Sequence, residues 1–258
     1  MVTAVERLSP GMVRVRFSSD DLSSFVGSAH TDRYVKLVLP QPDGSTVVRT
    51  YTAIEPALDD ETSAGTLAID FVVHGDEGVA GPWAATAEPG DALSVRGPGG
   101  GYAPDPEADW HLLAGDESAL PAIRAALAAL PEDSRGYAVL EVPSAEHEQP
   151  LDAPAGIEIR WLHTGSVDHR ALADAEGVEP PLLTAVRALA WLPGRVQAFV
   201  HGEARAVMHG VRPFLLKELG LPRADASVSG YWRRGRTEES FREWKRDLAE
   251  AEAEGGGA

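Results

Sequence analysis

The stretch that decides the fold is Thr46-Val47-Val48-Arg49-Thr50-Tyr51-Thr52. Its β-branched and aromatic residues predict a β-strand, because such side chains pack well on a pleated surface. Residues two apart in a strand share a face, so Arg49 and Tyr51 are expected to project to the same side. The stretch therefore brings a cation and an aromatic ring together near the end of a strand.

This pair of side chains suits a ligand that is aromatic at one end and carries phosphates at the other. The guanidinium of Arg49 can donate two parallel hydrogen bonds to a phosphate, and the ring of Tyr51 can stack on a flat heterocycle. Thr52, at the strand end, can offer its hydroxyl and its backbone N–H to the edge of such a ring. FAD and FMN fit this description. An ordinary exposed strand would show the same residues, so the interpretation depends on the rest of the chain.

Composition restricts the class of protein. The 258 residues are enough for one large domain or two ordinary ones. The net charge of −17, from 23 basic and 40 acidic side chains, argues against nucleic acid or an anionic membrane as the main partner. The chain has no cysteine for disulfides or iron–sulfur clusters, and its histidines lack metal-binding spacing. Residues 1–10 lack a signal-peptide pattern and no apolar run reaches the roughly 20 residues of a membrane span, so we expect a cytoplasmic protein.

The first part of the chain is predicted to be a β domain. Short apolar and β-branched segments, separated by turns such as residues 42–45, indicate strands and little helix. The predicted strands cover residues 12–17, 33–39, 46–52, 66–73 and 91–96. This pattern is typical of a small closed antiparallel barrel. Glycines and prolines crowd residues 97–106, so we predict two domains, 1–103 and 104–258.

The remainder alternates between strand and helix patterns. Strands are predicted at residues 110–114, 137–142, 157–161, 196–200 and 226–230. Helices are predicted at 118–130, 181–191, 203–219 and 238–254, and Pro213 is expected to kink the third of them. Alternating strands and helices imply a parallel sheet covered by helices on both faces. The expected fold class is therefore a β-barrel plus α/β.

Three loops are candidate ligand sites. Residues 78–84 form a glycine-rich loop that opens a short helix, where free N–H groups can bind a pyrophosphate. The strand ends within 112–122 and 199–203 lie at the predicted carboxyl edge of the parallel sheet, where ligands bind in open α/β folds. Gly115 is expected to let a ligand approach the backbone, and Ser118 to cap the following helix. Ordinary loops and helix starts without a ligand would show the same patterns.

Aromatic and basic residues follow the last predicted strand. The aromatic residues can lie near a flavin, and the basic residues can form an entrance for an anionic substrate in this acidic protein. The aromatic residues are Tyr231 and Trp232, and the basic residues are Arg233, Arg234 and Arg236. The alternative is that the arginines balance the acidic side chains that follow, namely Glu238, Glu239 and Glu243.

Seven short motifs spread over the full length carry a family resemblance. They are Arg-Thr-Tyr-Thr at 49–52, Asp-Phe-Val-Val-His-Gly at 70–75, Gly-Asp-Glu-Ser-Ala-Leu-Pro-Ala at 115–122, Glu-Val-Pro at 141–143, Glu-Gln-Pro-Leu at 148–151, Gly-Glu-Ala at 202–204 and Gly-Tyr-Trp-Arg-Arg-Gly at 230–235. In order and spacing the chain resembles the siderophore-interacting proteins, flavin-dependent ferric-siderophore reductases of the ferredoxin-reductase-like superfamily. The resemblance implies an N-terminal antiparallel FAD-binding barrel and a C-terminal parallel-sheet NAD(P)H-binding domain. Ile54 and Gly81 depart from the family pattern, which often has an arginine and a serine there.

The resemblance also implies the site residues. The FAD-binding residues would be Arg49, Tyr51, Thr52, Asp70, Phe71, Val72, His74, Ala80, Gly81 and Trp83, of which Tyr51 and Thr52 would be catalytic. The nicotinamide dinucleotide would contact Gly115, Asp116, Glu117, Ser118, Ala119, Gly202, Glu203 and Ala204. Tyr231 and Trp232 would complete the cofactor site, and the three arginines after them would bind the substrate.

The implied function is an oxidoreductase in which NADH or NADPH reduces FAD, and the flavin passes single electrons to the iron of a ferric siderophore. Ferrous iron is held less tightly by hard oxygen donors and is released. Two alternatives stay open: a flavin reductase with another acceptor, such as a quinone, a dye or a partner oxygenase, and a non-enzymatic siderophore-binding module. Arg205 can meet a 2′-phosphate, whereas resemblance to the subgroup with a C-terminal helix favours NADH. Neither the siderophore nor the oligomeric state can be read from the sequence.

Overall fold

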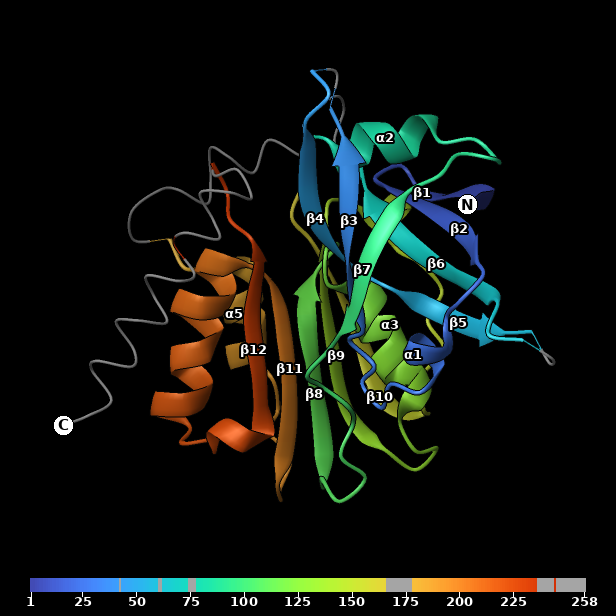
Figure 1. Ribbon diagram of the computed structural model, residues 1–258. Helices are drawn as coiled ribbons and strands as arrows, with labels where there is room; N and C mark the ends of the chain where they lie inside the picture. The colour runs from blue at the N-terminus through green and yellow to red at the C-terminus, as the bar shows by residue number, and fades with distance from the viewer. Residues whose placement is uncertain (42, 60–61, 74–77, 166–177, 236–243, 245–258) are drawn as a thin grey trace.

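The computed structural model describes residues 1–41, 43–59, 62–73, 78–165, 178–235 and 244. Figure 1 shows two halves side by side, one of antiparallel strands and one with a parallel sheet and its helices. The predicted combination of a flavin-type barrel and an α/β unit is confirmed. None of the helices within the described ranges is long and apolar enough to span a membrane.

The antiparallel half consists of two sheets around one core, with the strand orders β1-β2-β6-β5 and β4-β3-β7. The strands are β1 (Val2–Ser9), β2 (Met12–Ser19), β3 (Tyr34–Pro40), β4 (Thr46–Thr52), β5 (Ile54–Leu58), β6 (Gly65–Val72) and β7 (Ser94–Gly99). Two short helices, α1 (Ser23–Val26) and α2 (Ala80–Thr86), belong to the same half. The fully buried side chains of Val15, Leu37, Ile69 and Phe71 join the two sheets in one hydrophobic core.

The sequence pattern predicted five of these strands and missed β1 and β5. Both are edge strands, and most of their side chains are exposed. They therefore lack the alternation of apolar and polar residues that marks a half-buried strand. β5 also contains Pro56, which an edge strand tolerates because it lacks a partner on one side.

Part of the predicted domain boundary is strand. β7 continues to Gly99, which pairs with Tyr34 of β3. A side chain at Gly99 would overlap the ring of Tyr34, so this glycine is required by packing and does not mark a linker. The division between residues 103 and 104 stays a prediction.

The second half is a five-stranded parallel sheet of order β10-β9-β8-β11-β12. Its strands are β8 (Trp110–Asp116), β9 (Arg135–Val142), β10 (Gly156–His163), β11 (Val196–Glu203) and β12 (Ala226–Trp232). Helix α3 (Leu120–Ala129) packs on one face, against Leu113 and Phe199. Helix α5 (Pro181–Arg187) and the π-helix η2 (Arg205–Val211) pack on the other, against Leu112 and Val200. The short elements are η1 (Ala145–His147), η3 (Phe214–Glu218) and η4 (Arg223–Asp225).

Two helices begin later than predicted. α3 has Ala119 at its N-cap position and no side-chain cap, because the hydroxyl of Ser118 donates to Asp116 instead. Glu203 belongs to β11, so the helix predicted from that residue begins later, with η2. Arg212 and Pro213 have helical backbone angles, so the chain stays helical from η2 into η3, and the predicted kink at Pro213 stays a prediction. The predicted helix at 238–254 lies outside the described residues, apart from Trp244.

The two halves share a hydrophobic core. Met12 of β2 and Tyr102, which follows β7, are buried among the side chains of the parallel-sheet half. The amide of Gln149 donates to the sulfur of Met12 over 3.2 Å. The ring of Tyr102 lies 4.7 Å from that of Phe199, centroid to centroid, and Gln197 accepts a hydrogen bond from its hydroxyl. These contacts fix how the barrel sits against the sheet.

A buried ion pair joins β2 to β6. The guanidinium of Arg14 donates from Nε and Nη2 to the two carboxylate oxygens of Asp70, over 2.7 and 2.8 Å. The side chain of Asp70 is only 1% exposed. Arg14 also donates to Glu55, which in turn accepts from Arg16. Removing one member of the buried pair would leave an uncompensated charge in the interior.

Replacing Asp70 by Asn is expected to lower the free energy of unfolding by about 3–5 kcal/mol, because Arg14 would lose its buried counter-charge. Urea denaturation followed by circular dichroism measures this loss. The control is Glu158→Gln, which breaks an ion pair with Arg160 in which the side chains are 57% and 35% exposed. That variant should change stability by less than about 1 kcal/mol. Equal losses in the two variants would contradict the prediction.

Candidate functional site

The two halves meet where β12 reaches the end of β4. The side chain of Tyr231 on β12 lies beside that of Thr52, the last residue of β4. Thr52 is 7% exposed. Burial raises the pKa of the Tyr231 hydroxyl, and the charges of Asp32 and Asp116 add to this shift. Two residues that the sequence assigned to the cofactor site, from opposite ends of the chain, are therefore in contact.

The ring of His201 packs against the ring of Tyr231. Its ring stacks on Phe199 at 3.9 Å between centroids, and its edge meets Tyr231 at 4.9 Å with the planes 78° apart. Its Nε2 lies 3.0 Å from the hydroxyl of Ser227. His201 is not among the site residues predicted from the sequence. The signal available was its position at the end of a strand of the parallel sheet, two residues before the assigned Glu203.

Arg49 and Tyr51 lie on the inner face of β4, as their spacing predicts. Directly paired residues on neighbouring strands share a face, and these two pair with Leu37 and Val35, both fully buried. The ring of Tyr51 contacts Phe71, with centroids 4.7 Å apart and planes tilted by 37°. One side of the tyrosine ring is therefore covered by the protein itself.

Thr52 lies on the opposite face of the same strand. It pairs with Tyr34, which is 38% exposed. β4 thus presents Tyr51 to the barrel interior and Thr52 to Tyr231, and the expectation that Tyr51 stacks on a ring whose edge meets Thr52 stays a prediction. Tyr51 and Thr52 can contact the same ligand only if the ligand extends around the end of β4.

Some side chains assigned to FAD are part of the barrel core. Both carboxylate oxygens of Asp70 are bonded to Arg14, and Phe71 is fully buried. As side-chain contacts to a cofactor, these two assignments are corrected. Trp83 is half-buried and lies near Phe17 and Phe71, at 6.3 and 5.7 Å between centroids.

The predicted phosphate loop does open a helix. α2 begins at Ala80, and the preceding Val79 provides no side-chain cap. A Cβ at Gly81 would lie 3.0 Å from the carbonyl oxygen of Val72, so glycine allows α2 to pack on the end of β6. The first N–H groups of α2 keep their capacity to bind an anion, and that role stays a prediction. His74 lies outside the described residues.

Gly115 is required by the packing of the sheet. A Cβ at this position would overlap the carbonyl oxygen of His201 on β11 and lie 2.7 Å from the Cβ of Ala119. Packing is thus one reason for glycine at this position, and the expected role of Gly115 in admitting a ligand stays a prediction. Ala119 and Ala204 are themselves fully buried, so their side chains contribute to packing and not to a ligand surface.

Asp116 holds the carboxyl edge of the parallel sheet together. Its Oδ1 accepts hydrogen bonds from the N–H and the hydroxyl of Ser118, over 2.9 and 2.5 Å. Its Oδ2 accepts from the backbone N–H of Glu203 at 2.7 Å and from the indole N–H of Trp232 at 2.8 Å. Gly202 leaves room for this carboxylate, since a Cβ there would come within 2.8 Å of it. The carboxylate thus joins the ends of β8, β11 and β12.

Two carboxyl groups flank this edge, the buried Glu117 and the half-buried Glu141. Glu117 is 8% exposed and faces the turn at Gly11, where His147 also approaches. Burial and the nearby charge of Asp116 raise the pKa of Glu117 to about 7. The pKa of Glu141 is also raised to about 7, again by burial first and Asp116 second. Glu117 therefore lies between the two halves and not in an open dinucleotide site, which corrects its assignment.

The arginines assigned to the substrate are in contact with aromatic rings. The guanidinium carbon of Arg233 lies 4.7 Å from the ring centroid of Trp244, and that of Arg234 lies 6.0 Å from the centroid of Trp232. The backbone N–H of Arg234 also donates to Glu203 over 3.3 Å. Arg236 and the glutamates proposed to balance these arginines lie outside the described residues. Whether the arginines meet the substrate stays a prediction.

A second basic surface lies on the outer face of the β4-β3-β7 sheet. Lys36 of β3 and Arg96 of β7 are exposed, directly paired residues. Within the described part of the chain, neither forms an ion pair. Tyr34 lies two residues before Lys36, and therefore on the same face, opposite Thr52. We call Tyr34, Lys36 and Arg96 the basic face.

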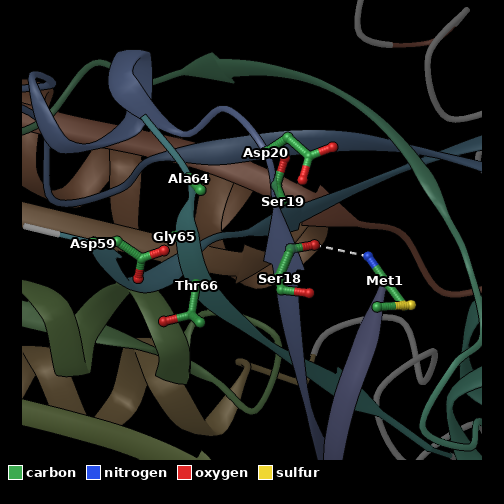
Figure 2. A pocket seen from close by; sticks show the side chains of 8 residues that line it. All are labelled: Met1, Ser18, Ser19, Asp20, Asp59, Ala64, Gly65 and Thr66. Atoms are coloured by element: carbon green, nitrogen blue, oxygen red, sulfur yellow. Dashed lines mark hydrogen bonds between the residues drawn. The ribbon is translucent and has the colours of Figure 1, made fainter. Parts of the chain in front are cut away.

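The hollow in Figure 2 is remote from these residues. It measures about 600 Å³ and is lined by Met1, Ser18, Ser19, Asp20, Asp59, Ala64, Gly65 and Thr66. The terminal ammonium of Met1 donates to the carbonyl oxygen of Ser18 over 2.8 Å beside it. Gly65 and Thr66 begin β6, whereas the candidate site adjoins the region where that strand ends. Among the described residues there is no cluster of three His, Cys, Asp or Glu side chains suited to a metal ion.

Comparison with known proteins identifies the family. Residues 108–235 match the model of the siderophore-interacting proteins, and residues 1–57 and 40–102 match their FAD-binding domain. The chain belongs to the siderophore-interacting protein family.

Three similar proteins illustrate the range of this family. An uncharacterized protein of Mycobacterium tuberculosis is 48% identical over 98% of this chain and 95% of its own. Ferric vibriobactin reductase ViuB of Vibrio cholerae is 32% identical over 92% of this chain and 89% of its own. The crystal structure of a siderophore utilization protein from T. fusca superposes with a TM-score of 0.72 at 40% identity, covering 92% of each chain.

Glu117 is expected to make this siderophore-interacting protein less stable as the pH rises from about 5 to about 7. Its pKa is raised from an ordinary value of 4.5 to about 7, so the folded state keeps a proton that the unfolded state has released. The free energy of unfolding therefore falls across this interval and levels off above it. Glu117→Gln removes this contribution. The variant should match the wild type near pH 5 and exceed its free energy of unfolding by on the order of 2 kcal/mol at pH 8.

Urea denaturation of both proteins at the two pH values measures this difference. The exposed Glu107 provides the control, because Glu107→Gln should leave the pH dependence unchanged. A difference between wild type and Glu117→Gln that is the same at pH 5 and pH 8 would refute the assignment.

Proposed function

We propose that this protein is an FAD-dependent reductase that uses a nicotinamide dinucleotide to reduce the iron of a ferric siderophore. The observation that carries the proposal is the contact between Thr52 and Tyr231. It joins the end of the predicted flavin strand to the last strand of the parallel sheet, so ligands bound by the two halves would meet there. Family membership and the relative named ferric vibriobactin reductase support the same reaction.

The residues present fit a flavin dinucleotide. Arg49 is half-buried on the barrel strand, and the N-terminus of α2 has no side-chain cap. The guanidinium and the helix N–H groups would hold phosphates. Thr52 would offer its hydroxyl to the ring edge, and Tyr231 and His201 would fix the position of that hydroxyl. When bound, FAD supplies the conversion of a two-electron transfer into single-electron transfers.

The proposed reaction balances with one dinucleotide for two ferric ions. NADH and two ferric ions give NAD⁺, a proton and two ferrous ions. The protein's contribution is to hold donor and acceptor close together and to keep water from the junction, for which the buried Thr52 and the half-buried Tyr231 are suited. Reduction lowers the charge on the iron, so the oxygen donors of the siderophore hold it less tightly and release it.

We propose NADH as the preferred dinucleotide and the cytoplasm as the compartment. Asp116, Glu141 and Glu203 lie together at the carboxyl edge of the sheet, as their mutual effects on the pKa of Glu141 indicate. Such a group of carboxyl side chains would repel the extra phosphate of NADPH. The cytoplasm follows from the proposed reductant, because nicotinamide dinucleotides are supplied there.

The proposed acceptor surface is the basic face. Like charges directly opposite on neighbouring strands destabilise a sheet. The pairing of Lys36 with Arg96 therefore lowers stability, and binding of an anionic substrate would account for its presence. In a chain of net charge −17, these cations provide a local attraction for an anionic ferric chelate. Tyr34 offers an exposed ring between them and Thr52, on which a planar chelating group can stack.

Anaerobic turnover tests the reaction. The FAD-loaded protein is expected to be reduced by NADH, and its flavin absorbance should recover when a ferric siderophore is added, with ferrous iron trapped by a colorimetric chelator. FAD, and not FMN, should be released by heat. Recovery of the absorbance with a quinone but not with the ferric siderophore would replace the proposed acceptor. A flavin that NADH does not reduce would refute the proposal.

Replacing Lys36 and Arg96 together by Gln is expected to raise KM for an anionic ferric chelate roughly fivefold at low salt, because two exposed attractions are removed. The change should be smaller for a neutral chelate and should shrink as salt screens the charges. Steady-state kinetics with both chelates measure this. The matched comparison is the Arg233→Gln, Arg234→Gln double variant. If only that variant shows charge-selective loss, the substrate lies at the arginines after β12 and not at the basic face.

A further inference from the structure

Trp232 is an exposed aromatic ring that is held in place. It ends β12, and 38% of the residue is exposed, in contrast to the buried Trp110. Its only polar atom, the indole Nε1, donates to Asp116 over 2.8 Å. Arg234 approaches the ring, with its guanidinium carbon 6.0 Å from the centroid. A large apolar surface is therefore presented to solvent without rotational freedom.

The anchor of this ring is itself fixed. Besides the indole, the carboxylate of Asp116 accepts hydrogen bonds from Ser118, twice, and from the backbone of Glu203. Asp116 ends β8, and these partners come from the end of β11 and from the turn before α3. Because an ionised carboxylate is an acceptor only, it can serve all of these donors at once. The orientation of the indole thus depends on the whole carboxyl edge.

The location is one where α/β sheets bind ligands. In the order β10-β9-β8-β11-β12, the chain leaves β8 toward one side of the sheet and β11 toward the other. Ligands of open α/β sheets bind at the carboxyl ends of the strands at such a switch point. Asp116 and Gly202 are the residues at that point, and Trp232 adjoins them.

Tyr231 and Trp232, which are neighbours on β12, contact residues on opposite sides of this edge. Tyr231 contacts His201 and Thr52, on the side of the barrel. Trp232 contacts Asp116. Leu112, Ala114 and Asp116 are alternate residues of β8 and so share one face of the sheet, which is the face that α5 covers. A dinucleotide that crosses the edge with its nicotinamide near Thr52 would bring its other ring toward Trp232.

We infer that Trp232 is the platform on which the adenine ring of the nicotinamide dinucleotide stacks, and that Asp116 is the positioning residue that holds this platform. The inference rests on the proposed function. An indole face stacks well on a purine. Arg234 places a positive charge beside the ring, at an edge where carboxylates would otherwise repel a phosphate. Asp116, whose oxygens already have four donors, acts through the indole and not on the ligand.

The first experiment separates the two halves of the dinucleotide. ADP-ribose carries the adenine half and nicotinamide mononucleotide the other, and calorimetry with the FAD-loaded full chain measures Kd for each. Trp232→Leu should raise Kd for ADP-ribose roughly tenfold, as expected for the loss of one base–aromatic stack. Trp232→Phe, which keeps a flat ring, should lose much less. Nicotinamide mononucleotide and FAD content should be unaffected in both variants.

The control is Leu219→Ala, because Leu219 is equally exposed, at 40%, but lies at the end of η3. It should leave Kd for ADP-ribose unchanged. Thermal unfolding shows whether each variant is folded. Trp232→Leu and Trp232→Phe both lack the indole N–H, so a difference between them reports on the ring and not on the lost hydrogen bond.

The second experiment tests the role of Asp116. Asp116→Asn replaces one acceptor oxygen by a donor, so it should loosen the indole and raise Kd for ADP-ribose severalfold. In the Trp232→Leu background the same change should have little further effect, since coupled residues are not additive. Full additivity would show that Asp116 does not act through Trp232 and would overturn that part of the inference.

The outcomes separate this inference from the proposed reaction. Unchanged affinity for ADP-ribose in Trp232→Leu, or no binding of ADP-ribose by the wild type, overturns the platform even if the flavin is reduced by NADH. Conversely, ADP-ribose can bind in a manner that depends on Trp232 while NADH fails to reduce the flavin. That result would support the platform and refute the proposed reaction.

Discussion

The carboxylate of Asp116 is the interaction on which the arrangement of the site depends. It gathers donors from Ser118, Glu203 and Trp232, which belong to three different segments of the parallel sheet. Only an acceptor with several lone pairs can satisfy so many donors, and a neutral amide cannot. Because the carboxylate is fully used inside the protein, the surfaces left for a ligand at this edge are aromatic rings and backbone, and Asp116 determines how they are presented.

The seam between the two halves has a comparable role for electron transfer. Met12 and Tyr102 are buried in the core of the parallel-sheet half, and Tyr231 lies beside Thr52. A close-packed seam of this kind keeps its geometry, because interiors pack at the density of organic crystals. Two ligands held by different halves would therefore meet at a fixed separation. Glu117 is buried at the same seam, and its raised pKa predicts that the stability of the seam depends on pH.

Charge is distributed unevenly over this acidic chain. The excess of negative charge repels anions at a distance, whereas Lys36 and Arg96 offer a local attraction on the outer face of β3 and β7. The arginines after β12 lie against aromatic rings, so part of their surface is used by the protein. An anionic chelate and an anionic dinucleotide would thus use different cations, which allows both to bind at once.

The sequence by itself determined the strand that carries Arg49, Tyr51 and Thr52, and the change from antiparallel to parallel architecture. These follow from alternation and from propensity, which are properties of residues close together in the chain. The edge strands β1 and β5 escaped prediction, because an exposed strand shows little alternation.

Only the tertiary structure decided which predicted site residues serve a ligand and which serve the protein. Asp70 is bonded to Arg14, 56 residues away, and Asp116 to Trp232, 116 residues away. Position 115 requires a glycine because the carbonyl oxygen of His201 lies where a side chain would be. A motif specifies that a carboxylate or a glycine is present. Its partner is brought close only when remote strands pack, and this packing determines whether the group is already used within the protein.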